Sequence, residues 1–429
     1  MKNSHIHNGI AAYFIAIFFL LMLIFPSQYQ FERGFFLVIL LYSSLLFVTI
    51  NPKSWRINRE LLVVSCICLF VSLFSISHGL YLDNPGALPL ISVYMVWPLL
   101  FIWIIGLPNN QATMFLMIKT IIIGSLSIGM IIILTVIGPL FGLNGMDFLE
   151  IFSVRSGVFA ESIKISSPMT PVLFFFLPFS ICLLLINKQI PVRYFSASWR
   201  RLLVLALILT VINLIITGRS VFWLVALVSV FLVMFIIRCC KLKRASIISY
   251  FLYFLLFSIF LFGLSLIVSE SLLVFDISVY FDLFVEKIFH ISDPGSVGYR
   301  RYEQLMNLLE GFYSSPLFGQ GLGAVEFNGS DVWQFELSYV ALLFQVGLIG
   351  VILYVLSFVW LFLVLVKLSR NNLNIAILAA PMLSGLLGFL LANATNPLLG
   401  KFDFLWVIFL PLALVNYGLR QNKSAGLFK

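Results

Sequence analysis

Long apolar stretches separated by short polar breaks dominate the 429-residue chain. A membrane-spanning helix needs about 20 mostly apolar residues, and breaks at charges, Pro and Gly leave twelve stretches near that length. They lie near residues 10–25, 34–50, 61–77, 88–107, 113–137, 171–186, 202–217, 220–237, 246–268, 336–366, 373–392 and 402–419. The stretches do not alternate as barrel strands do, so we expect an all-α polytopic membrane protein. The first apolar run is expected to be a span rather than a cleaved signal.

Composition agrees with this fold class. Apolar residues make up 62% of the chain and charged residues 10%, with a mean hydropathy of +1.10. A soluble domain has about 45–50% apolar and about 25% charged residues. The composition therefore excludes a water-soluble enzyme, a secreted disulfide scaffold and a disordered chain.

The distribution of Lys and Arg predicts the orientation. With a cytoplasmic N-terminus and twelve alternating spans, 17 of the 26 basic residues lie on the cytoplasmic side and eight lie outside, with Lys119 inside a span. This bias follows the positive-inside rule and predicts that both termini are cytoplasmic. The formal charge of +9 then combines a cytoplasmic face of +16 with an outer face of −8. The basic pI therefore reports topology, and we expect no nucleic-acid partner.

The spans and the two outer segments divide the chain into five parts. These are 1–137 (N-terminal spans), 138–170 (first extracytoplasmic segment), 171–268 (central spans), 269–335 (large extracytoplasmic loop between the ninth and tenth spans) and 336–429 (C-terminal spans and cytoplasmic tail). The large loop is too long for a simple connection and predicts two amphipathic helices, at 276–289 and 299–312. The second helix is expected to bury the face formed by Tyr302, Leu305, Met306, Leu309 and Phe312.

Two local patterns weigh against common ligand sites. Gly319-Gln320-Gly321-Leu322-Gly323 resembles a phosphate loop, but it follows no strand and lacks the Lys-Ser/Thr of that motif, which favours a flexible turn. The five cysteines and four histidines are scattered without zinc spacing. We therefore expect no metal held by the protein and no extracytoplasmic disulfide.

A few outer arginines are candidate anion ligands. Arg219 follows Thr217-Gly218 between two spans, where an Arg is costly unless it meets water, an anion or a carboxylate. The alternative is an Arg that snorkels to the interface. Arg155 lies in a polar turn at 153–157, and its alternative is a surface charge.

The pair Arg300-Arg301 begins the second loop helix and has two interpretations. The two guanidiniums are suited to different faces of one phosphate. Alternatively, they pair with Glu303 and Asp293 in a solvated ion-pair network.

Glu336 opens a long apolar span at the predicted outer face. A carboxylate at a helix N-terminus is stabilised by the helix dipole, so one interpretation is a helix cap. The other is a general base at the boundary between membrane and water.

Three patches resemble the superfamily of O-antigen polymerases and O-antigen ligases, which are bacterial membrane glycosyltransferases. They are Thr217-Gly218-Arg219-Ser220, the segment from Tyr299-Arg300-Arg301 to Gly321-Leu322-Gly323, and Glu336-Leu337-Ser338-Tyr339 followed by the run from Gln345 to Gly350. A weaker likeness lies at 154–159. Ligases of the superfamily carry a His-Asn pair where this chain has Glu336-Leu337, and this departure favours a polymerase.

The resemblance implies a metal-independent glycosyltransferase of the C-type-like membrane fold in the bacterial inner membrane, without a cofactor. It implies that undecaprenyl-pyrophosphate-linked oligosaccharide units are joined, with inversion, into a surface polysaccharide such as an O-antigen, a capsule or an exopolysaccharide. Glu336 would be the base, and Arg219 and Arg300, backed by Arg301 and Arg155, would bind the pyrophosphate. The Phe-rich spans would contact the prenyl chain and membrane lipid, and a chain-length regulator protein is a further conceivable partner.

Two other functions remain open at this stage. An O-antigen ligase would transfer the finished glycan to a lipid acceptor. A flippase for lipid-linked oligosaccharides, or another twelve-span transporter, would place ionisable residues and broken helices at mid-membrane. In this sequence only Lys119 lies well inside a predicted span, away from its ends, and the other polar candidates gather on one outer face.

Overall fold

The computed structural model describes residues 2–26, 30–50, 55–107, 110–137, 155–159, 162–192, 194–217, 220–242, 299–325 and 335–424. Helices cover eleven of the twelve predicted apolar stretches, and the remaining stretch, 246–268, lies outside the described residues. Seven described segments are long and apolar enough to cross a membrane: Arg59–Tyr81, Ala87–Gly106, Gln111–Thr135, Thr170–Gln189, Ser338–Asn371, Leu373–Asn393 and Phe402–Gln421. The chain is thus an α-helical multi-pass membrane protein, whereas the total of twelve spans stays a prediction.

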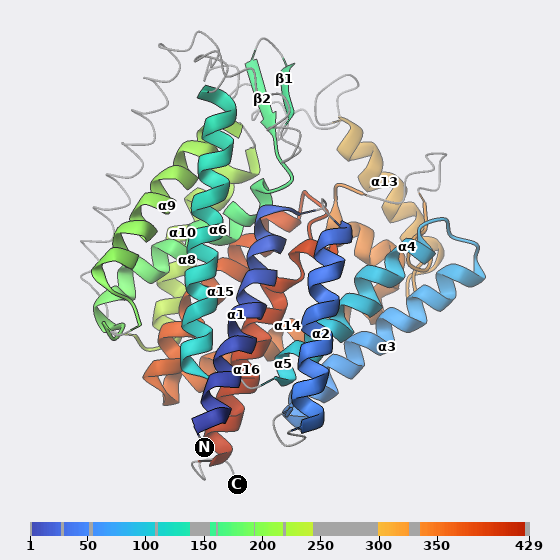
Figure 1. Cartoon of the computed structure of the whole chain (residues 1–429). Helices are drawn as coiled ribbons and strands as arrows, with labels where there is room; N and C mark the ends of the chain where they lie inside the picture. The colour runs from blue at the N-terminus through green and yellow to red at the C-terminus, as the bar shows by residue number, and fades with distance from the viewer. Residues whose placement is uncertain are drawn as a thin grey trace. The chain divides into compact units, whose positions relative to one another are not determined.

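The chain forms two compact units, each built from three separate stretches of sequence (Figure 1). Unit 1 contains Met1–Arg56, Leu107–Ser278 and Leu368–Phe389. Unit 2 contains Ile57–Gly106, Val279–Lys367 and Leu390–Lys429. Each unit therefore joins stretches that are far apart in sequence, whereas the division into five membrane and extracytoplasmic parts stays a prediction.

Unit 1 is a bundle in which small residues allow helices to approach closely. Its helices are α1 (Lys2–Ile24), α2 (Gln30–Ile50), α6 (Gln111–Ile137), α8 (Thr170–Ile186), the short η4 (Asn187–Gln189), α9 (Ala197–Thr217), α10 (Ser220–Cys239) and most of α15 (Leu373–Asn393). Helix α6 packs against α1 and α9. Gly385 and Gly388 of α15 lie directly against Phe175 and Pro178 of α8. Because the hydrophobic effect does not draw helices together in lipid, close packing of this kind is what holds them in contact.

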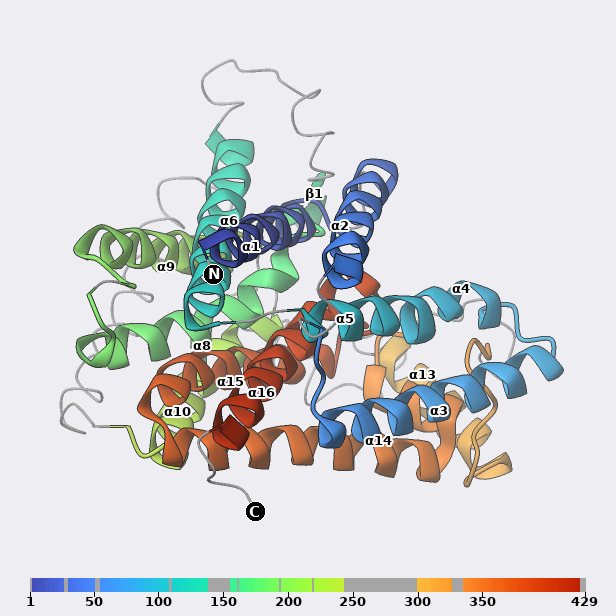
Figure 2. The ribbon, with the colours of Figure 1, turned by 60° about the horizontal axis from the view of Figure 1, so that its bottom comes forward.

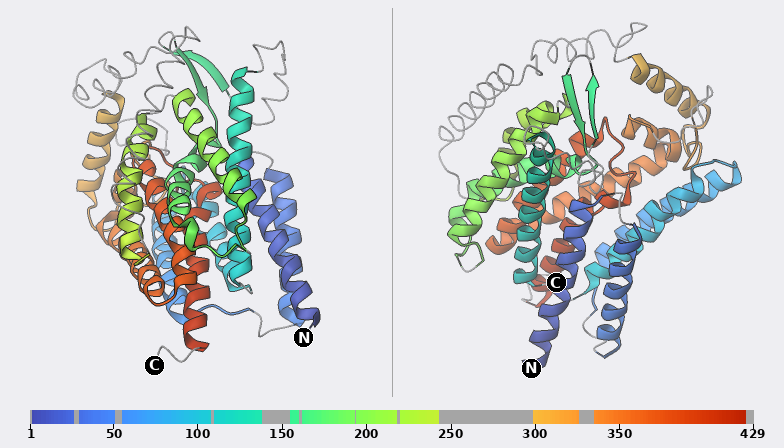
Figure 3. Two further views of the ribbon diagram at one scale, coloured as in Figure 1. Left: turned by 90° about the vertical axis from the view of Figure 1, so that its left-hand side faces the viewer. Right: turned by 45° about the horizontal axis from the view of Figure 1, so that its top comes forward.

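A β-hairpin interrupts the helical architecture of unit 1 (Figure 3). Strands β1 (Arg155–Phe159) and β2 (Ser162–Ser166) pair antiparallel, with Arg155 opposite Ser166. The polar turn predicted at 153–157 is therefore wrong for the part that the structure describes. Val158, Ile163 and Ile165 favour extended backbone, and pairing with the second strand overrides the turn signal of Ser156-Gly157.

Unit 2 is held together by polar contacts between helix segments. Its elements are α3 (Arg59–Tyr81), α4 (Ala87–Ile91), the π-helical η2 (Ser92–Val96), α5 (Trp97–Gly106), α13 (Tyr299–Ser314), most of α14 (Ser338–Asn371), η5 (Phe402–Phe404) and α16 (Trp406–Ser424). The fully buried Asn416 of α16 accepts a hydrogen bond from the Asn58 amide and donates one to the Ile105 carbonyl. Helix α3 runs beside α14 (Figure 2), where Ser72 and Tyr354 share a 2.8 Å hydrogen bond.

Helix α14 is broken at Gly347, whose φ of 66° and ψ of −177° are not helical. The segment 315–325, which we call the glycine loop, supplies partners for the backbone groups freed by this break. The Leu348 and Ile349 amides donate to the Pro316 and Leu317 carbonyls, and the Phe344 carbonyl accepts from the Gln320 amide. The loop therefore pairs with three backbone groups beside the break, as lipid requires of such groups.

The glycine loop is packed rather than flexible, and this corrects the sequence-based interpretation. Its Leu322 amide donates to the Ser75 carbonyl of α3, and the Gly86 amide before α4 donates to the Gly323 carbonyl. Gly319, Gly321 and Gly323 all have positive φ, between 70° and 81°. Three loop amides, those of residues 319, 320 and 322, donate to protein carbonyls, so they are not available to a phosphate.

Replacement of Gly323 by Ala should destabilise the fold. A Cβ there would meet the backbone of Gly86 and Ala87, and its φ of 81° is strained for any L side chain. We expect a loss of at least about 1–3 kcal/mol, measured by thermal unfolding of the purified full-length protein in detergent. The matched control is Gly400→Ala, where the nearest atom, the Pro397 carbonyl oxygen, is 3.6 Å from the added Cβ. Equal melting temperatures of the two variants would contradict the packed loop.

Candidate functional site

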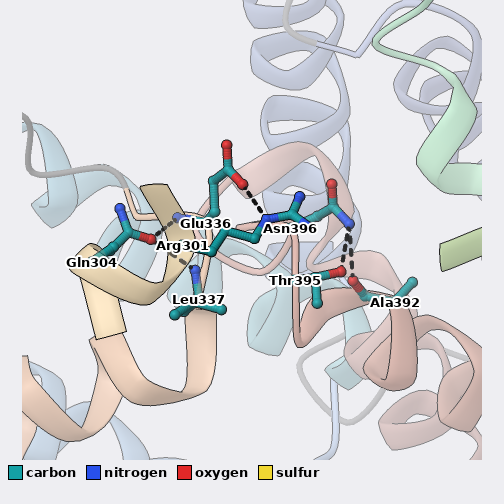
Figure 4. A network of polar contacts seen from close by, with 7 residues as sticks. All are labelled: Arg301, Gln304, Glu336, Leu337, Ala392, Thr395 and Asn396. Atoms are coloured by element: carbon teal, nitrogen blue, oxygen red, sulfur yellow. Dashed lines mark hydrogen bonds and ion pairs between the residues drawn. The ribbon is translucent and has the colours of Figure 1, made fainter. Parts of the chain in front are cut away.

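The predicted base and one of the predicted cations meet at the start of α14. Arg301 reaches from α13 to Glu336, and its Nε lies 2.6 Å from the Glu336 Oε2 (Figure 4). The two side chains are 34% and 47% exposed, respectively. This pair replaces the predicted pairing of the Arg300-Arg301 dipeptide with Glu303, and Asp293 lies outside the described residues. The second carboxylate oxygen, Oε1, has no partner among the described residues.

Gln304 fixes the backbone at Glu336 and was not among the predicted site residues. Its side-chain Oε1 accepts hydrogen bonds from the Glu336 amide at 2.8 Å and the Leu337 amide at 3.2 Å. Gln304 is only 8% exposed and lies three residues after Arg301, so both side chains project from one side of α13. The sequence carried no signal for this role, because Gln304 is not on the face of the helix that was predicted to be buried.

The buried face of α13 differs from the predicted one. Gln304, Leu308 and Gly311 are buried, whereas Met306 of the predicted face is 47% exposed. Leu308 joins a cluster made by the buried side chains of Ala324, Phe335, Ala341 and Phe344. Gly311 lies directly under the Phe344 ring, so the closest contact between α13 and α14 is made by a residue that has no side chain. Periodicity of apolar residues alone could not identify that contact.

The remaining predicted arginines are placed differently. Arg300 is exposed, and it makes no hydrogen bond or ion pair with another described residue. Arg155 begins β1, but its side chain lies outside the description. Arg219 also lies outside the described residues, which stop at Thr217 and resume at Ser220. The structure therefore brings Arg301 to Glu336 and leaves Arg300 as a cation without a described partner.

A largely apolar cavity of about 570 Å³ lies within unit 2. Its lining comes from α3, the α4–α5 segment, α14, the turn after α15 and α16. Phe335, Ser338 and Tyr339 contribute to it, so the cavity reaches the residues that flank Glu336. Most of its polar groups bond to one another or to the backbone, as in the 3.2 Å contact from the Cys68 thiol to the Ser357 hydroxyl. The volume falls in the range of about 300–1,000 Å³ typical of ligand sites.

The start of α14 is held beside the end of α15 in the same unit. The Tyr339 hydroxyl donates a 2.6 Å hydrogen bond to the Leu390 carbonyl. Asn393 and Lys401, on the turn that follows α15, also line the cavity. Lys401 therefore lines the cavity, and Glu336, which pairs with Arg301, lies in the chain between the lining residues Phe335 and Ser338.

Comparison with models of known protein families gives no match for this chain. Comparison with curated proteins gives none either.

Loss of the Gln304 side chain should cost more stability than loss of the ion pair. In Gln304→Ala two partly buried backbone amides lose their acceptor, and the cost of about 1–3 kcal/mol for a fully buried unsatisfied group is the upper bound for each. The exposed ion pair should contribute only about 0.2–1 kcal/mol, because solvent screens it. Thermal unfolding of Gln304→Ala, Arg301→Ala and the control Arg300→Ala would measure this order. A larger loss in Arg301→Ala would contradict it.

Proposed function

We propose that this protein is a polysaccharide polymerase that joins undecaprenyl-pyrophosphate-linked oligosaccharide units on the extracytoplasmic face of the bacterial inner membrane. The observation that carries the proposal is the Arg301–Glu336 pair, in which Glu336 lies between two residues that line an apolar cavity in unit 2, Phe335 and Ser338. A polymerase of this kind needs a base and cations near water and an apolar channel for a lipid carrier. Both features occur in one compact unit, which supports the proposal beyond the sequence resemblance.

The proposed reaction assigns each group a step. A hydroxyl of the acceptor unit attacks the anomeric carbon of the donor while Glu336 accepts its proton, as a general base must. The new carbon–oxygen bond forms on the face opposite the leaving group. The bond to the pyrophosphate oxygen breaks, and undecaprenyl pyrophosphate departs with the electron pair. Arg219 and Arg300 would stabilise the charge that develops on the pyrophosphate.

The Arg301–Glu336 ion pair gives the neighbouring residues Arg300 and Arg301 different roles in the proposed reaction. Arg301 is engaged with Oε2 of Glu336 and orients the carboxylate, which leaves Oε1 to face the acceptor hydroxyl. Arg300 has no described partner and is exposed, as a pyrophosphate ligand must be before substrate binds. In this proposal Arg301 is a positioning residue, and Arg300 contacts the substrate. Arg155 remains a further candidate ligand.

The alternatives receive less support from the same observations. A ligase of this superfamily has a histidine at the position of Glu336, and this chain does not. The break in α14 resembles the discontinuous helices of transporters, whose freed backbone groups coordinate substrate and ions. Here the groups freed at Gly347 bond to the glycine loop instead. Because these groups are occupied, the break does not favour a transport site.

Glu336→Gln and Arg219→Ala should each abolish long glycan chains while exported single repeat units persist. The first change removes the base, and the second removes a cation at the leaving group. Chain-length ladders of surface polysaccharide from cells that carry each variant would measure this, with membrane levels checked by immunoblot. Arg59→Ala is the control, since Arg59 is exposed at the start of α3 on the predicted cytoplasmic side. Wild-type ladders from either variant would refute the assigned role, and absence of exported units would instead favour a flippase.

Arg300→Lys should also impair polymerisation, by about tenfold or more, if Arg300 binds the pyrophosphate with two parallel hydrogen bonds. Lysine keeps the charge but not the planar fork. The rate of chain extension in membranes supplied with lipid-linked units would report the effect. Full activity of the lysine variant would mean that Arg300 is a surface charge.

A further inference from the structure

Lys401 is the one charged side chain among the described residues that line the cavity of unit 2. It lies on the turn between α15 and α16, is exposed, and has no ion-pair or side-chain hydrogen-bond partner among the described residues. The rest of the lining is apolar or consists of neutral polar groups. A cation at one end of an apolar cavity is complementary to a molecule with one anionic head and a long hydrocarbon chain.

The turn that carries Lys401 is rigidly built. The buried Asn393 accepts hydrogen bonds from the Leu398 amide at 3.0 Å and the Leu399 amide at 2.9 Å. The Lys401 amide donates to the Leu398 carbonyl at 3.1 Å. The next residue, Phe402, stacks on Trp97 of α5 with ring centroids 4.6 Å apart. The backbone of Lys401 is therefore fixed on both sides, while its side chain is left for a ligand.

A second unpaired donor lines the same cavity. The Ser338 hydroxyl oxygen is buried and has no hydrogen-bond partner among the described residues. The Ser338 hydroxyl is therefore free to donate a hydrogen bond to a ligand in the cavity. Ser338 begins α14, and the contact from its neighbour Tyr339 to Leu390 holds this helix end beside the end of α15, just before the Lys401 turn.

The shape of the lining favours a long chain. Lining residues on α14 and just before it extend from Phe335 to Leu361. These residues lie on both sides of the break at Gly347, so the lining follows two successive helical segments and suits a long chain better than a compact one. Among the lining residues, Ser72 forms a hydrogen bond with Tyr354 and Cys68 forms one with Ser357. These four side chains therefore do not need a polar partner from a ligand, and this part of the lining is compatible with a hydrocarbon chain.

We propose that Lys401 and Ser338 bind the phosphate head of a polyprenyl lipid whose chain lies in this cavity. The choice of a polyprenyl chain over a diacyl chain rests on the proposed function, in which the donor carrier leaves as a polyprenyl pyrophosphate. In that reaction Lys401 adds a cation from the α15–α16 turn to the arginines of the outer loops. The lipid site itself requires no sugar and no turnover.

The test is competition for a photoactivatable polyprenyl phosphate on the purified full-length protein in detergent. Wild type should prefer unlabelled polyprenyl phosphate over the matching polyprenol by about tenfold, the gain expected from a charge-assisted contact. Lys401→Ala should lose this preference and still bind polyprenol, whereas Lys401→Arg should retain it. Lys188→Ala, which removes an exposed lysine of unit 1, is the control and should behave as wild type.

Four outcomes would overturn the assignment. They are an unchanged preference in Lys401→Ala, photolabel that maps outside the lining residues, equal competition by phosphatidylglycerol, and equal competition by inorganic pyrophosphate alone. The third would mean a general phospholipid site, and the fourth a simple anion patch. The outcome is independent of polymerisation, because the assay contains no glycan. If cells that lack the protein still made long chains while the Lys401 preference held, the proposed function would fail and the lipid site would stand.

Discussion

The organisation of unit 2 depends on one constraint, which is that backbone groups inside a membrane must find partners within the protein. Gly347 breaks α14 and frees amides and a carbonyl, and the glycine loop pairs with them. The same loop bonds to Ser75 of α3 and to Gly86 before α4. Three helical elements are thus connected through a single segment. Positive φ at its glycines and close backbone contacts leave no room for side chains at these positions.

The site at Glu336 follows from this arrangement. The loop follows α13, and α13 packs against the start of α14, where Leu308 joins Phe335 and Phe344 and Gly311 lies against Phe344. Burial of Leu308, Phe335 and Phe344 then fixes the helix, and Gln304 caps the α14 backbone beneath Glu336. Because the Arg301–Glu336 pair is partly exposed, it orients the carboxylate without carrying much of the stability. Packing of α13 against α14 therefore positions Glu336, and the ion pair with Arg301 orients the Glu336 carboxylate.

The sequence predicted the helices better than their contacts. Apolar length located eleven of the helical stretches, and amphipathicity located α13, because these signals are local. The buried face of α13, the packed state of the glycine loop and the strand at Arg155 were predicted wrongly, since each depends on a distant partner. Gly311 packs against the Phe344 ring of α14, and the Leu322 amide of the glycine loop donates to the Ser75 carbonyl of α3. Glu336 and Arg301 were both identified as candidates, but their pairing and the role of Gln304 required the three-dimensional structure.

The polar groups of the cavity divide into two kinds, and the division bears on function. Deep in the lining, Ser72 bonds to Tyr354 and Cys68 to Ser357, which removes the cost of facing hydrocarbon. Toward the start of α14 the Ser338 hydroxyl is buried without a described partner, and Lys401 carries the only charge of the described lining. A cavity that only filled space would gain nothing from leaving such groups unpaired at one end. Their position beside the residues that flank Glu336 is what a lipid carrier with an anionic head would require.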